Sequence, residues 1–147
     1  MKVKECMCKQ VHYVSPNASV KDVAKLMLDK HIGCVPVCDI NKKLVGLVTD
    51  RDLILRSLAC EKDIFHTPVS EVMTTHIYKT IPEAETSDVS KIMYDYQVRR
   101  VPVVDADSLV GIVTIGDLTN NKNISSQDVS NTIEGICRCG QDAKNAE

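Results

Sequence analysis

The phrase "GLVTDRDL" at Gly46–Leu53 returns as "GIVTIGDL" at Gly111–Leu118. In both copies an apolar run rich in β-branched residues ends at a Thr, and an Asp follows in the spacing Thr-x-x-Asp, while the residues between them change. Thr and Asp are favoured at helix starts because their side-chain oxygens accept hydrogen bonds from unpaired backbone N–H groups. The phrase therefore predicts, twice, a strand that ends where a helix begins.

The repetition extends over most of the chain, with one residue deleted in the second copy before its last strand. Before the deletion, each matched position of the first copy lies 66 residues ahead of its counterpart in the second. The positions of the first copy are Val3, Glu5, Met7, Pro16, Ala18, Asp22, Val23, Lys25, Met27, Asp29, Val35-Pro36-Val37 and Asp39. Their counterparts are Val69, Glu71, Met73, Pro82, Ala84, Asp88, Val89, Lys91, Met93, Asp95, Val101-Pro102-Val103 and Asp105. Such self-similarity indicates an internal duplication.

Each copy is predicted to form a β-α-β-β-α unit. The extended stretches "VHYVSP" and "IYKTIP" precede helices, the first of which begins at Ser19 with Asp22 in a capping-box spacing. One apolar helix face is expected at Val20, Val23, Ala24, Met27 and Leu28, and the other at Val89, Ile92, Met93 and Tyr96. Two β-branched runs joined by a polar turn follow in each copy, as in a hairpin. The predicted fold class is α+β, with the two pseudo-twofold-related repeats packed sheet to sheet.

The sequence divides into three segments. Residues 1–66 hold the first repeat with an N-terminal segment and a connector, residues 67–121 the second repeat, and residues 122–147 a helical, cysteine-containing tail. In the tail, a short helix is expected after Ser125 or Ser126, with an apolar stripe at Val129, Ile133 and Ile136.

The composition excludes several classes of protein. Net charge is -2, with 44% hydrophobic and 26% charged residues, which fits a globular domain and argues against a sequence-independent nucleic-acid binder. No apolar run reaches the roughly 20 residues of a membrane span, and the start "MKVKECMCK" lacks the apolar region of a secretory signal. A cytoplasmic location is expected. No phosphate-binding loop, nucleophile elbow or HExxH motif occurs, so we do not expect an enzyme.

The cysteines leave one alternative open. Cys6-x-Cys8 and Cys137-x-Cys139 lie near opposite ends of the chain, and four thiolates could hold zinc or an iron–sulfur cluster if the ends met. Plain unpaired thiols are the other interpretation, and we expect no required metal or cofactor.

The repeats resemble a tandem pair of cystathionine-β-synthase (CBS) domains of the stand-alone bacterial type. The resemblance covers roughly Val3 to Asn120 and is carried by "HIGCVPV" and "QVRRVPV", each followed by a hairpin and Thr-x-x-Asp. It implies a regulatory module that binds adenosine-containing ligands (AMP, ADP, ATP or S-adenosylmethionine) in clefts between the repeats, as a sensor of cellular energy or of a metabolite. It also implies a homodimer and a separate target protein.

The resemblance also implies a set of ligand-binding residues. Asp52 and Asp117 would accept hydrogen bonds from ribose hydroxyls, and Thr49 and Thr114 would contact phosphate beside the helix starts. The further candidates are Val35, Pro36, Val101 and Pro102 for the base and Arg51, Arg99 and Arg100 for phosphate. Because the two linings differ, one tight site and one weak or empty site are expected.

Two other interpretations stay open. Thr-x-x-Asp could serve only as a helix start, in which case the protein would be a dimerising interaction module without a ligand. The cysteines could make it a metal or redox sensor. The dimer is expected to form through apolar faces at Leu53, Ile54 and Leu58, and at the equivalent segment after Leu118.

Overall fold

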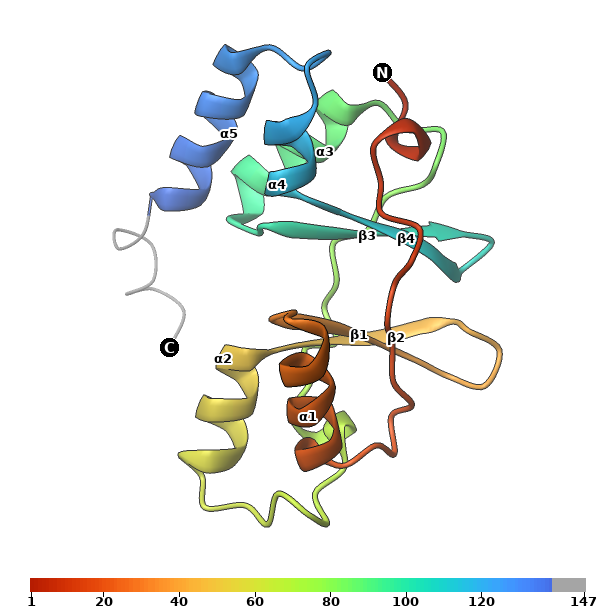
Figure 1. Cartoon of the computed structure of the whole chain (residues 1–147), viewed down its shortest axis with the longest axis vertical. Coiled ribbons are helices and arrows are strands. Elements are labelled where there is room, and N and C mark those ends of the chain that lie inside the picture. The colour runs from red at the N-terminus through yellow and green to blue at the C-terminus, as the bar shows by residue number, and fades with distance from the viewer. Residues whose placement is uncertain (139–147) are drawn as a thin grey trace. The chain divides into compact units, whose positions relative to one another are not determined.

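A computed structural model describes residues 1–138 and divides into two compact units (Figure 1). The first-repeat unit consists of His12–Ile77 with Ala106–Leu109. Of the described residues, the second-repeat unit contains Met1–Val11, Tyr78–Asp105 and residues 110–138. Each unit contains one two-stranded sheet, so the predicted α+β class is confirmed.

The first-repeat unit places two helices beside a hairpin. Its elements are α1 (Val20–Lys30), β1 (Cys34–Cys38), β2 (Leu44–Thr49), α2 (Asp50–Leu53), the π-helix η2 (Ile54–Leu58) that continues α2, and the 3₁₀ helix η3 (Val69–Glu71). β1 and β2 are antiparallel, with Cys34 opposite Thr49 and an irregularity between Val37 and Cys38. The buried core consists of Val20, Val23, Met27, Val35, Val37, Val48, Leu53, Val69 and Val72.

The second-repeat unit has the same plan and one additional helix. Its elements are the 3₁₀ helix η1 (Val3–Glu5), α3 (Thr86–Tyr96), β3 (Arg100–Asp105), β4 (Ser108–Thr114), α4 (Ile115–Asn120) and α5 (Ser126–Cys137). Its buried core consists of Val3, Val89, Met93, Val101, Val103, Val113, Leu118 and Ile136. Ile136 belongs to α5, which therefore completes this core and has no counterpart in the other unit (Figure 1).

Each sheet is covered by the segment that precedes the other repeat in the chain. Cys8 exchanges backbone hydrogen bonds with Ile112 on β4 (2.9 and 3.0 Å), and Met7 lies against Gly111. In the same way Thr74 exchanges hydrogen bonds with Leu47 on β2 (2.7 and 2.9 Å), and Met73 lies against Gly46. A Cβ atom at either glycine would overlap the methionine side chain, so a larger residue there would require the methionine to move. The segment before the first repeat thus belongs to the second-repeat unit, and the segment before the second repeat belongs to the first-repeat unit.

Some predicted elements differ from the observed ones. The stretches "VHYVSP" and "IYKTIP" form single parallel bridges, Val14 with Val37 and Thr80 with Val103, rather than full strands. On α1, Val20, Val23 and Met27 are buried, but the predictions for Ala24 and Leu28 are wrong because both are exposed. A helix that packs on a two-stranded sheet buries only a narrow stripe, which leaves the flanking positions in solvent.

In the second repeat the predicted helix face is also narrower than expected. Val89 and Met93 are buried on α3, Ile92 is half-buried and Tyr96 is 50% exposed. The Tyr96 ring stacks on Tyr78, with 3.8 Å between the ring centroids. Tyr96 therefore contacts the segment that leads into the repeat and contributes little to the core.

The tail helix α5 begins where it was predicted, since the Ser125 hydroxyl accepts a hydrogen bond from the Asp128 N–H (3.1 Å). Its buried face consists of Thr132, Gly135 and Ile136, so the prediction that Ile133 belongs to the apolar stripe is wrong: it is 41% exposed. At Gly135 the helix lies directly against the Tyr94 ring of α3, and a Cβ atom there would overlap the ring. Arg138 covers the same ring, with its guanidinium carbon 4.8 Å from the centroid.

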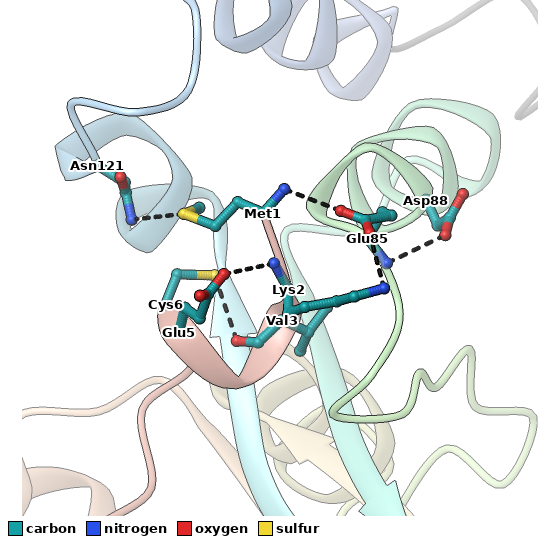
Figure 2. A network of polar contacts seen from close by, with 8 residues as sticks. All are labelled: Met1, Lys2, Val3, Glu5, Cys6, Glu85, Asp88 and Asn121. Carbon is teal, nitrogen blue, oxygen red and sulfur yellow. Dashed lines mark hydrogen bonds and ion pairs between the residues drawn. The ribbon is translucent and has the colours of Figure 1, made fainter.

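An ion-pair network attaches the first residues of the chain to α3 (Figure 2). The Glu85 carboxylate contacts the Met1 ammonium group (2.8 Å) and the Lys2 ammonium group (2.7 Å). These hydrogen bonds, from Lys2 first and then from the N-terminal ammonium group, lower the pKa of Glu85 to about 2. The backbone adds a hydrogen bond from Val3 N–H to Ala84 O (2.9 Å), which places Val3 in the core.

The contact between Gly135 and Tyr94 gives a stability prediction. Gly135→Ala should lower the free energy of unfolding by about 1–3 kcal/mol because the ring and the new methyl group cannot occupy the same space. Combined with Tyr94→Ala, the same change should cost little, which a double-mutant cycle from urea melts would measure. Gly116→Ala is the matched control, because its Cβ atom would lie 3.5 Å from Thr114 Oγ1, an ordinary contact. An equal loss from Gly135→Ala with and without the Tyr94 ring would contradict this packing.

The Glu85 network gives a pH prediction. Because the pKa of Glu85 falls from 4.5 to about 2 on folding, its stabilising effect is complete above pH 4.5 and is lost as the pH falls toward 2. Glu85→Gln should therefore lower stability at pH 6 and flatten the pH dependence between 4.5 and 2, as urea melts at several pH values would show. Glu83→Gln, which removes the partner of Lys4 (2.7 Å), is the control. A wild-type profile identical to that of Glu85→Gln would disprove the assignment.

Candidate functional site

Each Thr-x-x-Asp forms a strand–helix corner held by reciprocal hydrogen bonds. In the first corner, Thr49 N–H donates to Asp52 Oδ2 (3.0 Å) and Asp52 N–H donates to Thr49 Oγ1 (3.1 Å). In the second corner, Thr114 N–H donates to Asp117 Oδ2 (2.7 Å) and Asp117 N–H donates to Thr114 Oγ1 (3.2 Å). Both corners are therefore capping boxes with Asp in the place of the more frequent Glu.

The two carboxylates have different surroundings. Asp52 Oδ1 lies 3.7 Å from Arg56 Nη2, and Arg56 is itself held by hydrogen bonds to Val72 O and Thr74 Oγ1 (both 3.1 Å). At the equivalent place after the second corner stands Asn121, whose amide donates to Met1 Sδ (3.5 Å; Figure 2). Within residues 1–138, Asp117 has no ion-pair partner. The charge of Asp52 is thus balanced, while that of Asp117 is not.

Backbone pairing brings the start of the neighbouring strand to each corner. In the first corner Asp50 N–H donates to Gly33 O (3.1 Å), and in the second Ile115 N–H donates to Arg99 O (3.0 Å). The exposed Arg99 and the half-buried Arg100 therefore lie at the strand start beside the second corner. Arg51 is exposed in the first turn of α2, at the first corner. The second corner thus combines an unbalanced carboxylate with two neighbouring arginines.

The predicted base-lining residues are buried in the cores. Val35 and Val101 have no exposed surface and pack within their own repeats, so a ligand could reach their side chains only by opening the core. Pro36 and Pro102 are also buried and project from the opposite face of each strand. Their carbonyl groups accept hydrogen bonds from Val14 N–H (3.1 Å) and Thr80 N–H (3.0 Å).

A cavity that sequence reasoning missed borders the second corner. Its volume is about 410 Å³, within the range of ligand sites. It is lined by Arg99, Ile115, Gly116, Thr119, Asn120, Ile133, Ile136 and Cys137. Three of these residues come from α5, so the tail helix provides one wall. The signal in the sequence was the apolar stripe of α5, but periodicity alone does not tell which element a helix packs against.

The cysteines do not form a metal site in the part of the chain that the structure describes. Within residues 1–138, no three His, Cys, Asp or Glu side chains lie close enough to share a metal ion, and Cys139 lies outside this range. Burial, and then the negative charge of Asp117, raise the pKa of Cys6, and burial raises that of Cys38 to about 11. Both thiols therefore stay protonated near neutral pH, a form that is a poor metal ligand and a poor nucleophile.

The helices of residues 1–138 are all too short or too polar to cross a lipid bilayer.

Comparison with known proteins agrees with the two-repeat architecture. The CBS domain family matches residues 3–59 and 69–122. The CBS domain-containing protein YhcV of Bacillus subtilis is 40% identical over 134 residues, which are 91% of this chain and 94% of YhcV.

Two solved structures that contain adenosine ligands are similar to this chain. The structure of CBSX2 in complex with AMP has a TM-score of 0.70, with 33% identity over 79% of this chain and 91% of CBSX2. The CBS domain pair of protein MJ0100, in complex with 5′-methylthioadenosine and S-adenosyl-L-methionine, has a TM-score of 0.70 and 29% identity over 92% of this chain and 97% of the pair. With both repeats matched in tandem, the chain belongs to the CBS domain family.

Proposed function

We propose that this protein is a non-catalytic regulatory module that binds an adenosine nucleotide at the second corner. The observation that carries the proposal is the difference between the two carboxylates. Asp52 is paired with Arg56, whereas Asp117 has no cationic partner within the described residues and lies near Arg99 and Arg100. Of the two sites that the resemblance implies, the second is then the tight one.

The chemistry of the second corner suits a ribose diol. Asp117 Oδ2 accepts hydrogen bonds from the Thr114 N–H and hydroxyl groups (both 2.7 Å), which fix the orientation of the carboxylate. Among the residues described, no group donates to Asp117 Oδ1. A carboxylate oxygen can accept from more than one hydroxyl group, so a ribose would bind without breaking the helix cap.

The phosphate of the nucleotide would be bound by arginine. Arg99 is exposed and lies beside Ile115, and Arg100 follows at the start of β3. A guanidinium group forms charge-assisted hydrogen bonds to phosphate that are stronger than neutral ones. At the first corner the equivalent positions are Gly33 and Cys34, which offer no cation. Arg51 stands there beside Arg56, which is paired with Asp52.

Known neighbours support this class of ligand. CBSX2 is a complex with AMP, and the MJ0100 pair is a complex with 5′-methylthioadenosine and S-adenosyl-L-methionine. By the same resemblance we propose that the protein acts as a homodimer in the cytoplasm and regulates a separate target protein.

One observation favours a second candidate function. In both corners the Thr and Asp side chains already satisfy each other as helix caps, so the repeated motif has a structural role without any ligand. The protein would then be an interaction module that dimerises and binds no nucleotide. Ligand titration separates the two functions.

Calorimetric titration of AMP into two matched variants tests the proposal. Asp117→Ala should weaken AMP binding by about ten- to hundredfold, the equivalent of about 1.5–3 kcal/mol for charge-assisted hydrogen bonds. Asp52→Ala should change AMP affinity little, because its carboxylate is already paired with Arg56. Each change removes the same cap, so both variants should lose a similar stability of about 0.5–2 kcal/mol, which thermal melts check.

Adenosine provides the control for the phosphate. Arg99→Ala should weaken AMP binding and leave adenosine binding unchanged if the guanidinium group binds phosphate. Folded Asp117→Ala protein that binds AMP as the wild type does would contradict the proposed site. No binding of AMP, ADP, ATP or S-adenosylmethionine to the wild type would favour the interaction module.

A further inference from the structure

The segment after Leu118 was expected to form an apolar dimer surface, and the structure corrects this expectation. Helix α4 ends at Asn120, the positions that follow Leu118 are polar, and α5 packs beside them (Figure 1). The cavity of about 410 Å³ that borders the second corner lies between these two helices. Within residues 1–138 the first-repeat unit has no helix equivalent to α5, so α5 gives the second repeat a cavity wall that the first repeat lacks.

The cavity lies on a different face of α4 from the carboxylate of Asp117. Its lining includes four α4 residues, at positions i, i+1, i+4 and i+5 counted from Ile115, which share one side of the helix. Asp117 is not among the lining residues, and its carboxylate accepts hydrogen bonds from Thr114. The cavity is therefore separate from the proposed ribose site.

The walls of the cavity are aliphatic on both sides. Ile115 comes from α4, while Ile133 and Ile136 lie about one turn apart on α5. Ile136 is 5% exposed and belongs to the core, whereas Ile133 is 41% exposed and lies outside the core. An apolar ligand in the cavity would remove this exposed surface from water, which is favourable.

One cation borders this apolar space. Among the described residues that line the cavity, Arg99 is the only charged one, and it has no ion-pair partner within residues 1–138. The polar lining residues are neutral, and the Thr119 hydroxyl already donates to Ile115 O (2.8 Å). A guanidinium group binds a carboxylate through two parallel hydrogen bonds. A single cation beside aliphatic walls therefore matches a ligand with one carboxylate and an alkyl chain.

We propose that the cavity between α4 and α5 binds an aliphatic carboxylate, with the carboxylate on Arg99 and the alkyl chain against Ile133 and Ile136. A polyphosphate would fit poorly, because its further charges would face isoleucine side chains without a cation. This inference goes beyond the nucleotide of the proposed function and shares only Arg99 with it. Each ligand is therefore titrated in the absence of the other.

Calorimetric titration of butanoate, hexanoate and octanoate into the full chain tests the chemistry of the ligand. Affinity should rise about tenfold at each step, because each pair of added methylene groups leaves water for the aliphatic walls. Octan-1-ol has the same chain without the charge and should bind at least about tenfold more weakly than octanoate. Binding of none of the carboxylates, an affinity that does not change with chain length, or equal binding of octanoate and octan-1-ol would overturn the proposal.

Three variants test the residues. Arg99→Gln should abolish the preference for octanoate over octan-1-ol, because the charged partner of the carboxylate is gone. Ile133→Glu should weaken octanoate binding by about tenfold or more, since it places a negative charge in the aliphatic wall. Ile81→Glu is the matched control, at an isoleucine of the same unit that is 54% exposed and does not line the cavity. Folded Ile133→Glu protein, confirmed by circular dichroism melts, that binds octanoate as Ile81→Glu does would contradict the site.

The thiol of Cys137 reports where the carboxylate binds without any substitution. Cys137 is exposed at the end of α5 and lines the cavity, whereas Cys8 and Cys60 are exposed elsewhere. Saturating octanoate should slow the reaction of Cys137 with iodoacetamide severalfold and leave the other two rates unchanged, as mass spectrometry of tryptic peptides would show. An unchanged rate at Cys137, or equal slowing of all three thiols, would place octanoate outside the cavity and overturn the proposal.

Failure of this inference and failure of the proposed ligand function give different results. Wild-type protein that binds AMP but none of the carboxylates would overturn the cavity site and leave the nucleotide site standing. Wild-type protein that binds octanoate with protection of Cys137, but binds no nucleotide, would support the cavity site and overturn the proposed function.

Discussion

The reciprocal hydrogen bonds between Thr and Asp at the two strand–helix corners determine where the other functional groups lie. Each pair ends a β-strand and starts a helix within one turn, because both side chains satisfy backbone N–H groups that would otherwise lack a partner. The turn fixes the carboxylate beside the start of the neighbouring strand, where Arg99 stands in the second repeat. A helix cap and a ligand-binding carboxylate can therefore be the same side chain.

The exchange of segments between the repeats supplies part of the packing of each sheet. A sheet of two strands cannot bury both faces with one pair of helices. Here Met7 covers Gly111 and Met73 covers Gly46, so each repeat completes the unit built on the other. The repeats nevertheless differ at their surfaces. Asn121 stands at the position equivalent to Arg56, and within residues 1–138 only the second-repeat unit has a helix such as α5.

Much of the fold could be predicted from the sequence because it depends on local patterns. The repeat, the helix caps at Thr49, Thr114 and Ser125, and the order of elements all follow from spacing and side-chain type. The segment exchange could not be predicted, since repeat-equivalent residues are chemically alike and either copy could pack on either sheet. Val35 and Val101 were expected to line the base slots. Because β1 and β3 are buried along most of their length, the sequence pattern did not distinguish a core residue from a ligand-facing one. Asp52 and Arg56 are four residues apart, the spacing of an ion pair on a helix. The sequence did not show that the helix after Asp52 continues as far as Arg56, so this pair was not predicted.

Asp117, which has no cationic partner within residues 1–138, is proposed to bind the ligand, whereas Asp52 is paired with Arg56. The most direct test follows backbone amide signals by two-dimensional NMR while AMP is added to the ¹⁵N-labelled wild type. We expect the largest shift changes at Thr114–Leu118 and at Arg99 and Arg100, with small changes at Thr49–Leu53. Shift changes concentrated at Thr49–Leu53, or none at either corner, would contradict it.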